Sequence, residues 1–298
     1  MTSLRAWLQA SRLPSQSYIA LPLLLGQFVA VRLTGRPLDI GTLLGVQLFG
    51  LLDQLFIVYA NDWADQETDR LNRTATLFSG GSRVLVEGRL SSRALGIAAL
   101  VCAVGLVAVS VGLAVTRGVP LLVPLALAAL ALLWAYSYAP LRLSYRGGGE
   151  LLQMVGVSGV LPLYGYLAQG GDFGRFPWWL VACLLPTHLA CAIATALPDE
   201  PSDRESRKLT LPARVGGEHA AWVILALNAL TLVLAPLGLE SVGLHADLWL
   251  LLPALAALGV VLTRPAPPGS RRILVRVASA ITATTAMVSL PLVALALR

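Results

Sequence analysis

Residues 51–70 read LLDQLFIVYANDWADQETDR, an apolar segment that runs directly into a group of acidic side chains. The apolar part belongs to a longer stretch, residues 39–60. A stretch of about 20 apolar residues is what one α-helix needs to cross the hydrocarbon core of a bilayer. The sequence therefore predicts a membrane-spanning helix that ends, at one face of the membrane, in a cluster of carboxylates.

The rest of the chain has the same apolar character. Hydrophobic residues make up 56% of the 298 residues and charged residues only 13%, whereas about a quarter of the residues in a soluble domain are charged. The apolar runs are continuous and do not alternate as in a membrane β-barrel. We therefore predict an all-α fold, a polytopic bundle of nine transmembrane helices that forms one domain over residues 1–298. The predicted spans are 17–35, 39–60, 94–115, 119–139, 150–168, 177–197, 220–239, 247–263 and 273–296.

The net charge of +6 follows the predicted topology and does not indicate nucleic-acid binding. With the N-terminus inside, most Lys and Arg residues fall in the inner segments, which is the positive-inside pattern. The outer segments keep Arg32, Arg36, Arg117, Arg175 and Arg298. This bias predicts a multi-pass protein of a bacterial-type inner (cell) membrane, with a cytoplasmic N-terminus and an external C-terminus. Residues 1–16 are amphipathic and suit an interfacial helix better than a cleavable signal.

The first acidic motif repeats every fourth residue. If the helix continues past the membrane surface, Asn61, Asp65 and Asp69 lie on one of its faces. Asp62 lies about 100° around the helix and should point elsewhere. Three oxygen ligands at this spacing suit Mg²⁺, which is usually bound by one or two carboxylates together with substrate phosphates. A solvated acidic helix end is the alternative interpretation.

A second acidic motif, ALPDEPSDRESRKLTLPARVG (residues 196–216), ends the predicted span 177–197. Asp199 and Asp203 again stand four residues apart, and basic residues follow them. Carboxylates would hold a cation while Arg and Lys bind phosphate oxygens. An ordinary charged loop is the alternative, but both motifs fall in long loops on the same predicted membrane face, residues 61–93 and 198–219. Pro198 and Pro201 predict a break or kink in the helix.

The two motifs together resemble those of the UbiA superfamily of intramembrane prenyltransferases, and the resemblance covers most of the chain. It implies a UbiA-type fold and Mg²⁺ ions that hold the diphosphate of an isoprenoid donor. The metal ligands that it implies are Asn61, Asp65, Asp69, Asp199 and Asp203, with the four aspartates as catalytic residues. The residues expected to bind substrates are Arg12, Asp53, Arg70, Ser79, Arg83, Tyr136, Arg142, Arg146, Arg204 and Lys208.

Two further stretches resemble the 1,4-dihydroxy-2-naphthoate polyprenyltransferase branch of the menaquinone pathway. They are SGGSRVLVEG (residues 79–88) and YSYAPLRLSYRGGGE (residues 136–150). The 4-hydroxybenzoate enzymes usually carry a lysine where Pro140 stands here, and Arg142 or Arg146 could supply the missing charge. The resemblance implies transfer of a polyprenyl group to dihydroxynaphthoate with loss of its carboxyl group as CO₂. The alternatives are 4-hydroxybenzoate or another aromatic acceptor, or a UbiA-type terpene cyclase.

Asp53 lies within the predicted span 39–60, two helical turns before Asn61. An ionisable residue at that depth should face the interior of the bundle. There Asp53, with Gln54 beside it, would either contact the acceptor or form a structural hydrogen bond. A transporter is the main alternative from another class, and it would place its ionisable groups near the bilayer midplane. Only Asp53 favours it, because the other acids cluster at one face.

Overall fold

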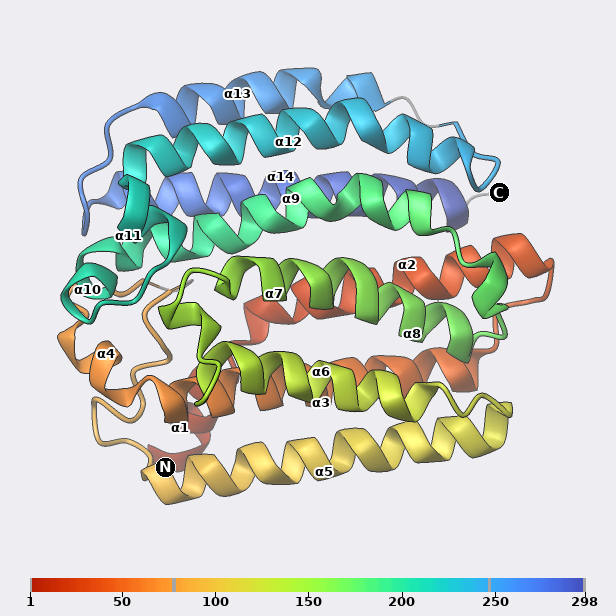
Figure 1. Ribbon diagram of the computed structural model, residues 1–298, viewed down its shortest axis with the longest axis horizontal. Coiled ribbons are helices and arrows are strands. Elements are labelled where there is room, and N and C mark those ends of the chain that lie inside the picture. Colours follow the sequence, from red (N-terminus) through yellow and green to blue (C-terminus); the bar gives the residue numbers. More distant parts are fainter. Residues whose placement is uncertain (1, 77–78, 246–247, 297–298) are drawn as a thin grey trace.

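The computed structural model describes residues 2–76, 79–245 and 248–296. Within these ranges the regular structure is helical, and the only β-type pairing is an isolated bridge between Thr76 and Ser79. The long helices run side by side along one direction (Figure 1). The predicted all-α fold is therefore confirmed. Residue 247, where the predicted span 247–263 begins, and Arg298 lie outside the described residues.

The apolar runs of the sequence form the long helices. These are α2 (Ser17–Thr34), α3 (Ile40–Ala64), α5 (Ser92–Arg117), α6 (Leu122–Ser137), α9 (Trp178–Ala196), α12 (Gly217–Glu240), α13 (Leu252–Thr263) and α14 (Arg271–Ala296). The predicted span 150–168 is α7 (Gly149–Val155) and α8 (Leu161–Ala168) with a π-helical turn, Gly156–Val160, between them. Among the described residues, seven helical stretches are long and apolar enough to cross a membrane. Since α6 and α13 are shorter, nine crossings stay a prediction.

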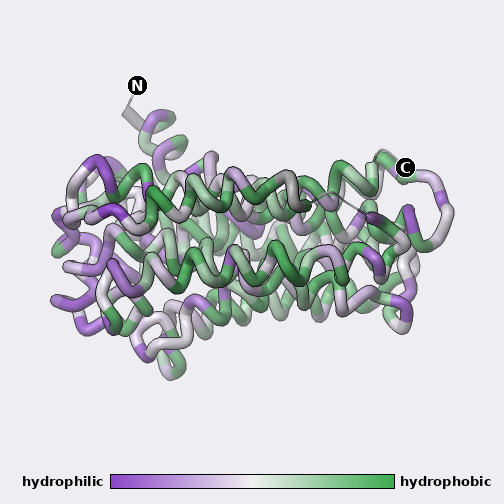
Figure 2. Tube along the Cα trace, turned by 90° about the horizontal axis from the view of Figure 1, so that it is seen from above, coloured by the Kyte–Doolittle hydropathy of each residue, from purple (hydrophilic) through white to green (hydrophobic). Residues whose placement is uncertain are grey.

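The surface of the bundle is suited to lipid. Large apolar side chains such as Leu100, Val115 and Val233 are more than 60% exposed, which would be unfavourable in water over so wide an area. Figure 2 shows hydrophobic residues along the middle of the helices and hydrophilic residues gathered at the two ends. The chain is therefore a multi-pass membrane protein.

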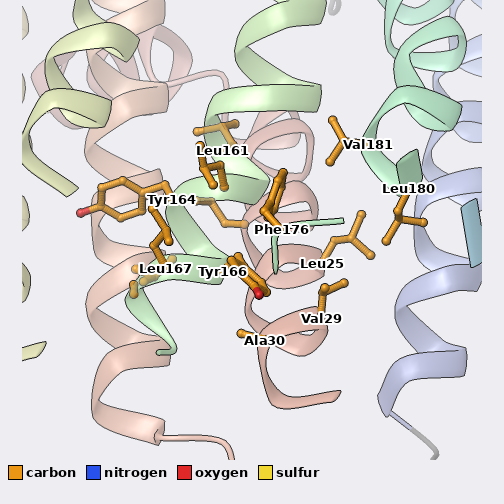
Figure 3. Packing of buried hydrophobic residues seen from close by; sticks show 14 of the residues in the cluster. Leu25, Val29, Ala30, Leu161, Tyr164, Tyr166, Leu167, Phe176, Leu180 and Val181 are labelled. Atoms are coloured by element: carbon orange, nitrogen blue, oxygen red, sulfur yellow. The ribbon is translucent and has the colours of Figure 1, made fainter. Parts of the chain in front are cut away.

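Small residues allow close helix packing at the centre of the bundle. A Cβ atom on Gly26 of α2 would overlap the Pro162 carbonyl of α8, and one on Gly165 would overlap the Leu23 carbonyl. Close approach of this kind is how membrane helices gain packing without a hydrophobic driving force. Nearby, the rings of Tyr166 and Phe176 pack edge to face, with 5.1 Å between the ring centres, among aliphatic side chains of α2 and α9 (Figure 3).

Helix breaks at one end of the bundle shape the acidic motifs. The condition of one continuous helix through Asn61 and Asp69 is not met, because α3 ends at Ala64 and α4 (Gln66–Leu71) begins after a break at Asp65. The carboxylate of Asp65 bonds to distant residues at this break, and these tertiary contacts override the helical continuation. The Asp65 N–H still donates to Asn61 O and the Asp69 N–H to Asp65 O, so the fourfold spacing is retained.

The second motif is broken as its prolines predict. A 3₁₀ turn, Leu197–Asp199, follows α9, and α10 (Glu200–Glu205) begins with Pro201 in its first turn. Proline is tolerated there because the first N–H groups of a helix have no partner within the helix. A short helix, α11 (Leu211–Val215), leads on to α12. The motif helices α4 and α10 contact each other at the end of the bundle that also holds α1 (Thr2–Ala10) (Figure 1).

Candidate active site

One cavity of about 800 Å³ opens between the two acidic motifs and extends into the bundle. Residues of α2, α3, α6, α7, α9 and α14 form most of its walls, together with the short helices and loops at the motif end. Most of the predicted site residues lie on this wall. They are Arg12, Asp53, Asn61, Asp65, Asp69, Ser79, Arg83, Tyr136, Asp199, Asp203 and Lys208.

Asp65 is the best-connected carboxylate of the first motif. Its Oδ2 atom accepts hydrogen bonds from Lys208 Nζ at 3.0 Å and from Asn61 Nδ2 at 3.1 Å. Its Oδ1 atom accepts one from the Tyr145 hydroxyl at 3.1 Å. Lys208 belongs to the second motif, so this ion pair joins the two motifs directly.

Asp199 of the second motif is held by residues that follow the first motif. Asn72 Nδ2 donates to Asp199 Oδ1 at 2.7 Å, and the Gly80 N–H donates to Asp199 Oδ2 at 2.9 Å. Asp203 accepts a hydrogen bond from Thr210 Oγ1 at 2.7 Å. The position of Asp199 therefore depends on a loop more than 100 residues away in the sequence.

The glycine-rich turn at residues 79–83 fits closely against the first motif. Gly80 and Gly81 both adopt positive φ, 76° and 71°, which glycine tolerates without strain. A Cβ atom on Gly81 would overlap Asp69 Oδ2. Arg83 then donates to the backbone carbonyls of Asp69, at 2.6 Å, and Asn72, at 3.0 Å. The turn thus supports both motifs. The N–H groups of Gly80 and Ser82 are bonded to aspartates of the protein, so they do not bind a substrate anion.

Asp62 points away from the cavity, as its place on the helix predicts. It is absent from the cavity wall and pairs instead with Arg12. The backbone N–H and the hydroxyl of Ser82 also donate to its carboxylate. These bonds fasten the turn at residues 79–83 and the chain after α1 to the end of α3.

Four of the predicted substrate-binding residues do not line the cavity: Arg70, Arg142, Arg146 and Arg204. The guanidinium of Arg142 stacks 3.7 Å above the centre of the Tyr145 ring. Arg204 pairs with Glu200 at 3.0 Å and is 54% exposed. Arg142 and Arg146, the two residues expected to supply the charge of the lysine missing at Pro140, are therefore both absent from the cavity wall.

The comparison with known families agrees with this geometry. The model of the UbiA prenyltransferase family matches residues 19–272. The chain belongs to this family. The predicted enzyme class, a prenyltransferase, is thereby confirmed. A comparison with curated protein sequences gives no significant match.

Solved structures of UbiA proteins share the fold along nearly the whole chain. A UbiA homologue from Aeropyrum pernix K1 is 20% identical with a TM-score of 0.67, covering 94% of this chain and 97% of its own. A homologue from Archaeoglobus fulgidus bound to GPP and Mg²⁺ is 15% identical with a TM-score of 0.62, and the match covers 98% of this chain and 99% of the homologue. A digeranylgeranylglyceryl phosphate synthase structure is 16% identical, also with a TM-score of 0.62, and the match covers 99% of both chains. At these identities the likeness concerns the fold.

The electrostatics of the UbiA site show uncompensated negative charge. Burial, together with the neighbouring carboxylates of Asp62 and Asp65, raises the pKa of Asp69 to about 7. Burial alone would lower the pKa of Lys208, but Asp65 and Asp203 reverse the effect and hold this pKa well above its usual value. A carboxylate whose pKa is raised by its neighbours is one that a cation would stabilise.

The donor set suits a hard divalent cation. Carboxylate and amide oxygens are the ligands that Mg²⁺ prefers, and both motifs present them to one cavity. In the geometry of the described residues, no three His, Cys, Asp or Glu side chains lie close enough together to hold a metal ion. Lys208 and Asn72 occupy oxygens of Asp65 and Asp199 instead. The residues therefore fit Mg²⁺ by chemistry. Lys208 would give up its bond to Asp65, whereas Asn72 would keep orienting Asp199, because a carboxylate oxygen has a second lone pair for a metal ion.

Several residues of the site escape prediction from the sequence. Asn72 and Thr68, which bonds to the Tyr145 hydroxyl at 2.6 Å, belong to no repeat of the motif. Glu150 lines the cavity and accepts a hydrogen bond from the Leu211 N–H at 2.6 Å. A signal for Asn72 does exist, since it continues the polar face of α4 three residues after Asp69.

Proposed function

We propose that this chain transfers a prenyl group from an isoprenoid diphosphate to an aromatic acceptor, with Mg²⁺ as its cofactor. The observation that carries the proposal is the meeting of two acidic motifs, about 140 residues apart in sequence, on the wall of one cavity. Lys208, bonded to Asp65 and electrostatically coupled to Asp203, adds a cation between them. Such a mixture of carboxylates and a lysine suits a metal-bound polyanion.

The residues of the two motifs would divide the work of binding diphosphate. Asn61, Asp65 and Asp69 on one side and Asp199 and Asp203 on the other would hold the cation. When bound, Mg²⁺ supplies Lewis-acid stabilisation of the negative charge that develops on the leaving diphosphate. The A. fulgidus homologue was solved with GPP and Mg²⁺, which supports a metal-bound prenyl diphosphate as the ligand of this fold.

The basic side chains on the cavity wall would complete the diphosphate site. Lys208 Nζ would exchange the Asp65 carboxylate for a phosphate oxygen once a metal ion neutralises Asp65. Arg83 is already fixed by the carbonyls of Asp69 and Asn72, so its remaining N–H groups would point at the same anion. Preorganised donors of this kind stabilise charge where it develops.

The deeper part of the cavity would protect the allylic cation that remains. Its wall is mainly apolar, with Ile57, Val157 and Leu161 among its residues, which excludes water from a reactive intermediate. The ring of Tyr136 faces the same cavity, and attraction between a cation and an aromatic face is worth about 1–2 kcal/mol. An electron-rich carbon of the acceptor would then attack the cation.

For the acceptor we propose 1,4-dihydroxy-2-naphthoate, which places the reaction in menaquinone biosynthesis. Two sequence stretches support this choice, the turn at residues 79–83 and the segment 136–150. The turn packs against both motifs, and Pro140 replaces the lysine that is usual in 4-hydroxybenzoate enzymes. Loss of the acceptor carboxyl group as CO₂ would give demethylmenaquinone, which has a hydrogen atom where menaquinone carries its ring methyl group.

We also propose that the motif end of the bundle faces the cytoplasm. Basic residues concentrate at this end, as the positive-inside rule requires. Helix α1 lies at this end, and α14 ends at the opposite one (Figure 1). This placement supports a cytoplasmic N-terminus and an external C-terminus in a bacterial-type inner membrane.

An acceptor panel tests the proposed function. Purified protein in detergent receives MgCl₂, a prenyl diphosphate and one of four additions: dihydroxynaphthoate, hydroxybenzoate, homogentisate or no acceptor. We expect diphosphate release with dihydroxynaphthoate and a prenylated, decarboxylated product by mass spectrometry. Turnover with another acceptor only would contradict the naphthoate assignment. Diphosphate release and a cyclic hydrocarbon without any acceptor would identify a terpene cyclase.

A further inference from the structure

Asp53 is a buried carboxylate that the binding of diphosphate does not use. It lies in α3, eight residues before Asn61, and lines the same cavity. At a rise of 1.5 Å per residue, it sits about 12 Å farther into the bundle than Asn61. Its side chain is only 2% exposed, and its Oδ1 atom has no hydrogen-bond partner in the part of the chain that the structure describes.

The neighbours of Asp53 on the cavity wall do not satisfy it. Gln54 is buried beside it, but its amide donates to the Ser15 hydroxyl. Ile57, one turn along the same face of α3, is apolar. Arg12, which also lines the cavity, is paired with Asp62. A buried acceptor without a donor is costly to keep, so one that faces a cavity indicates a ligand that brings the donor.

Four of the five other carboxylates of the cavity accept hydrogen bonds from protein groups, and the fifth, Asp69, lies at the mouth with the first motif. Asp65, Asp199 and Asp203 lie at the mouth with the motifs and accept hydrogen bonds from protein groups. Glu150 accepts one from a backbone N–H. Asp53 is set apart from these four by its missing partner and from the motif aspartates, Asp69 included, by its depth. Its role is therefore distinct from that of the proposed metal ligands.

We infer that Asp53 accepts a hydrogen bond from a hydroxyl group of the acceptor and thereby selects hydroxylated acceptors. The inference rests on the proposed function. The hydrocarbon chain of the donor carries no hydrogen-bond donor, so the group that meets Asp53 comes from the second substrate. A deprotonated acid group has no hydrogen to donate to Asp53. An acceptor that carries both a hydroxyl and an acid group is therefore oriented with its hydroxyl inward and its acid group toward the basic side chains at the mouth.

Binding of a matched pair of ligands tests this role. The pair is 1,4-dihydroxy-2-naphthoate and its dimethyl ether, titrated anaerobically in detergent with MgCl₂ and an unreactive prenyl thiodiphosphate. We expect the wild-type protein to bind the hydroxylated ligand about tenfold or more tightly, the effect of one or two hydrogen bonds. Asp53→Leu should bind both ligands equally, and Asp53→Asn, which keeps an acceptor oxygen, should retain part of the preference.

Gln47→Leu is the matched control. Gln47 is a half-buried polar residue of the same helix that lies off the cavity wall, where its amide donates to Gln27 at 3.3 Å. This variant should keep the wild-type preference. Stabilisation by Mg²⁺ and the thiodiphosphate verifies that each variant is folded, and Asp53→Asn alone decides the outcome if Asp53→Leu does not fold.

The outcomes separate this inference from the proposed function. An unchanged preference in the Asp53 variants, or no preference or no binding in the wild type, overturns the role of Asp53. Prenyl transfer by the wild type is measured in parallel. In another outcome, the wild type fails to transfer the prenyl group but still prefers the hydroxylated ligand, whereas the Asp53 variants do not. That result contradicts the proposed function and leaves the hydroxyl-binding site in place.

Discussion

The two acidic motifs reach the same cavity by different structural means. The first motif extends a long helix, and its backbone keeps the fourfold spacing across the break at Asp65. The second is broken by prolines, and Asn72 and Gly80 hold its first carboxylate in place from the other half of the chain. The first motif thus keeps its fourfold spacing through its own backbone hydrogen bonds, whereas the position of Asp199 in the second motif depends on contacts from a distant loop. Substitutions in the loop after α4 should therefore displace Asp199, although they leave the sequence of the second motif unchanged.

Removing one carboxylate from either motif should have the largest effect. Asp65→Ala and Asp199→Ala should each reduce prenyl transfer by at least about 100-fold, because each removes stabilisation of developing charge. The rate is measured in detergent with saturating MgCl₂, and size-exclusion chromatography checks that both variants stay folded. Full activity in either variant would show that its motif is not part of the site.

Asn72→Ala should impair the second motif selectively. Asp199 would lose the donor that orients it, and loss of such an outer partner costs about 10–100-fold in metal affinity or activity. We expect a higher Mg²⁺ concentration for half-maximal activity, with recovery at high MgCl₂. Gln66→Ala, which alters a polar residue of α4 away from the cavity, should leave this concentration unchanged. An unchanged Mg²⁺ dependence in Asn72→Ala would mean that Asp199 holds its own position.

Two glycine substitutions separate backbone strain from contact with the first motif. Gly81 and Gly88 both have positive φ, 71° and 66°, so alanine costs about 1–2 kcal/mol of stability at either position. A Cβ atom at Gly81 would overlap Asp69, whereas one at Gly88 meets nothing within 4 Å. Gly81→Ala should therefore also displace the Asp69 carboxylate and weaken binding of the prenyl diphosphate. A loss of about 1.4 kcal/mol of binding free energy corresponds to roughly tenfold weaker binding. Equal binding by the two variants would contradict the packing of the turn against Asp69.

The smallest expected effect is on stability as a function of pH. The pKa of Asp69, about 7, lies above that of an unfolded aspartic acid, so the folded protein holds this proton more tightly. The stabilisation is complete below about pH 4 and is lost as the pH rises through 7. The Tm of the metal-free protein should fall between pH 5 and 8, and added MgCl₂ should raise Tm more at pH 8 than at pH 5.5. Asp69→Asn should reduce both the fall of Tm with pH and the pH dependence of the Mg²⁺ effect. If this variant behaves like the wild type, the raised pKa of Asp69 is contradicted.

Much of this fold follows from the sequence, because apolar length alone locates the long helices. The inward position of Asp53 and the break at Pro198 follow likewise from burial cost and proline chemistry. The break at Asp65 does not, since it depends on bonds to Lys208 and Tyr145 that only the tertiary structure creates. The same holds for Arg142, which local sequence places near the site but which stacks on Tyr145 outside the cavity.

The central claim is that the two motifs act as one site for a metal-bound diphosphate. Calorimetric titration of an unreactive prenyl thiodiphosphate tests it directly, with and without MgCl₂, on wild type, Asp65→Asn, Asp199→Asn and the double variant. We predict binding that requires Mg²⁺, a large loss in each single variant, and little further loss in the double variant, because residues that act as a unit are not additive. Mg²⁺-independent binding, or losses that simply add, would contradict a shared site.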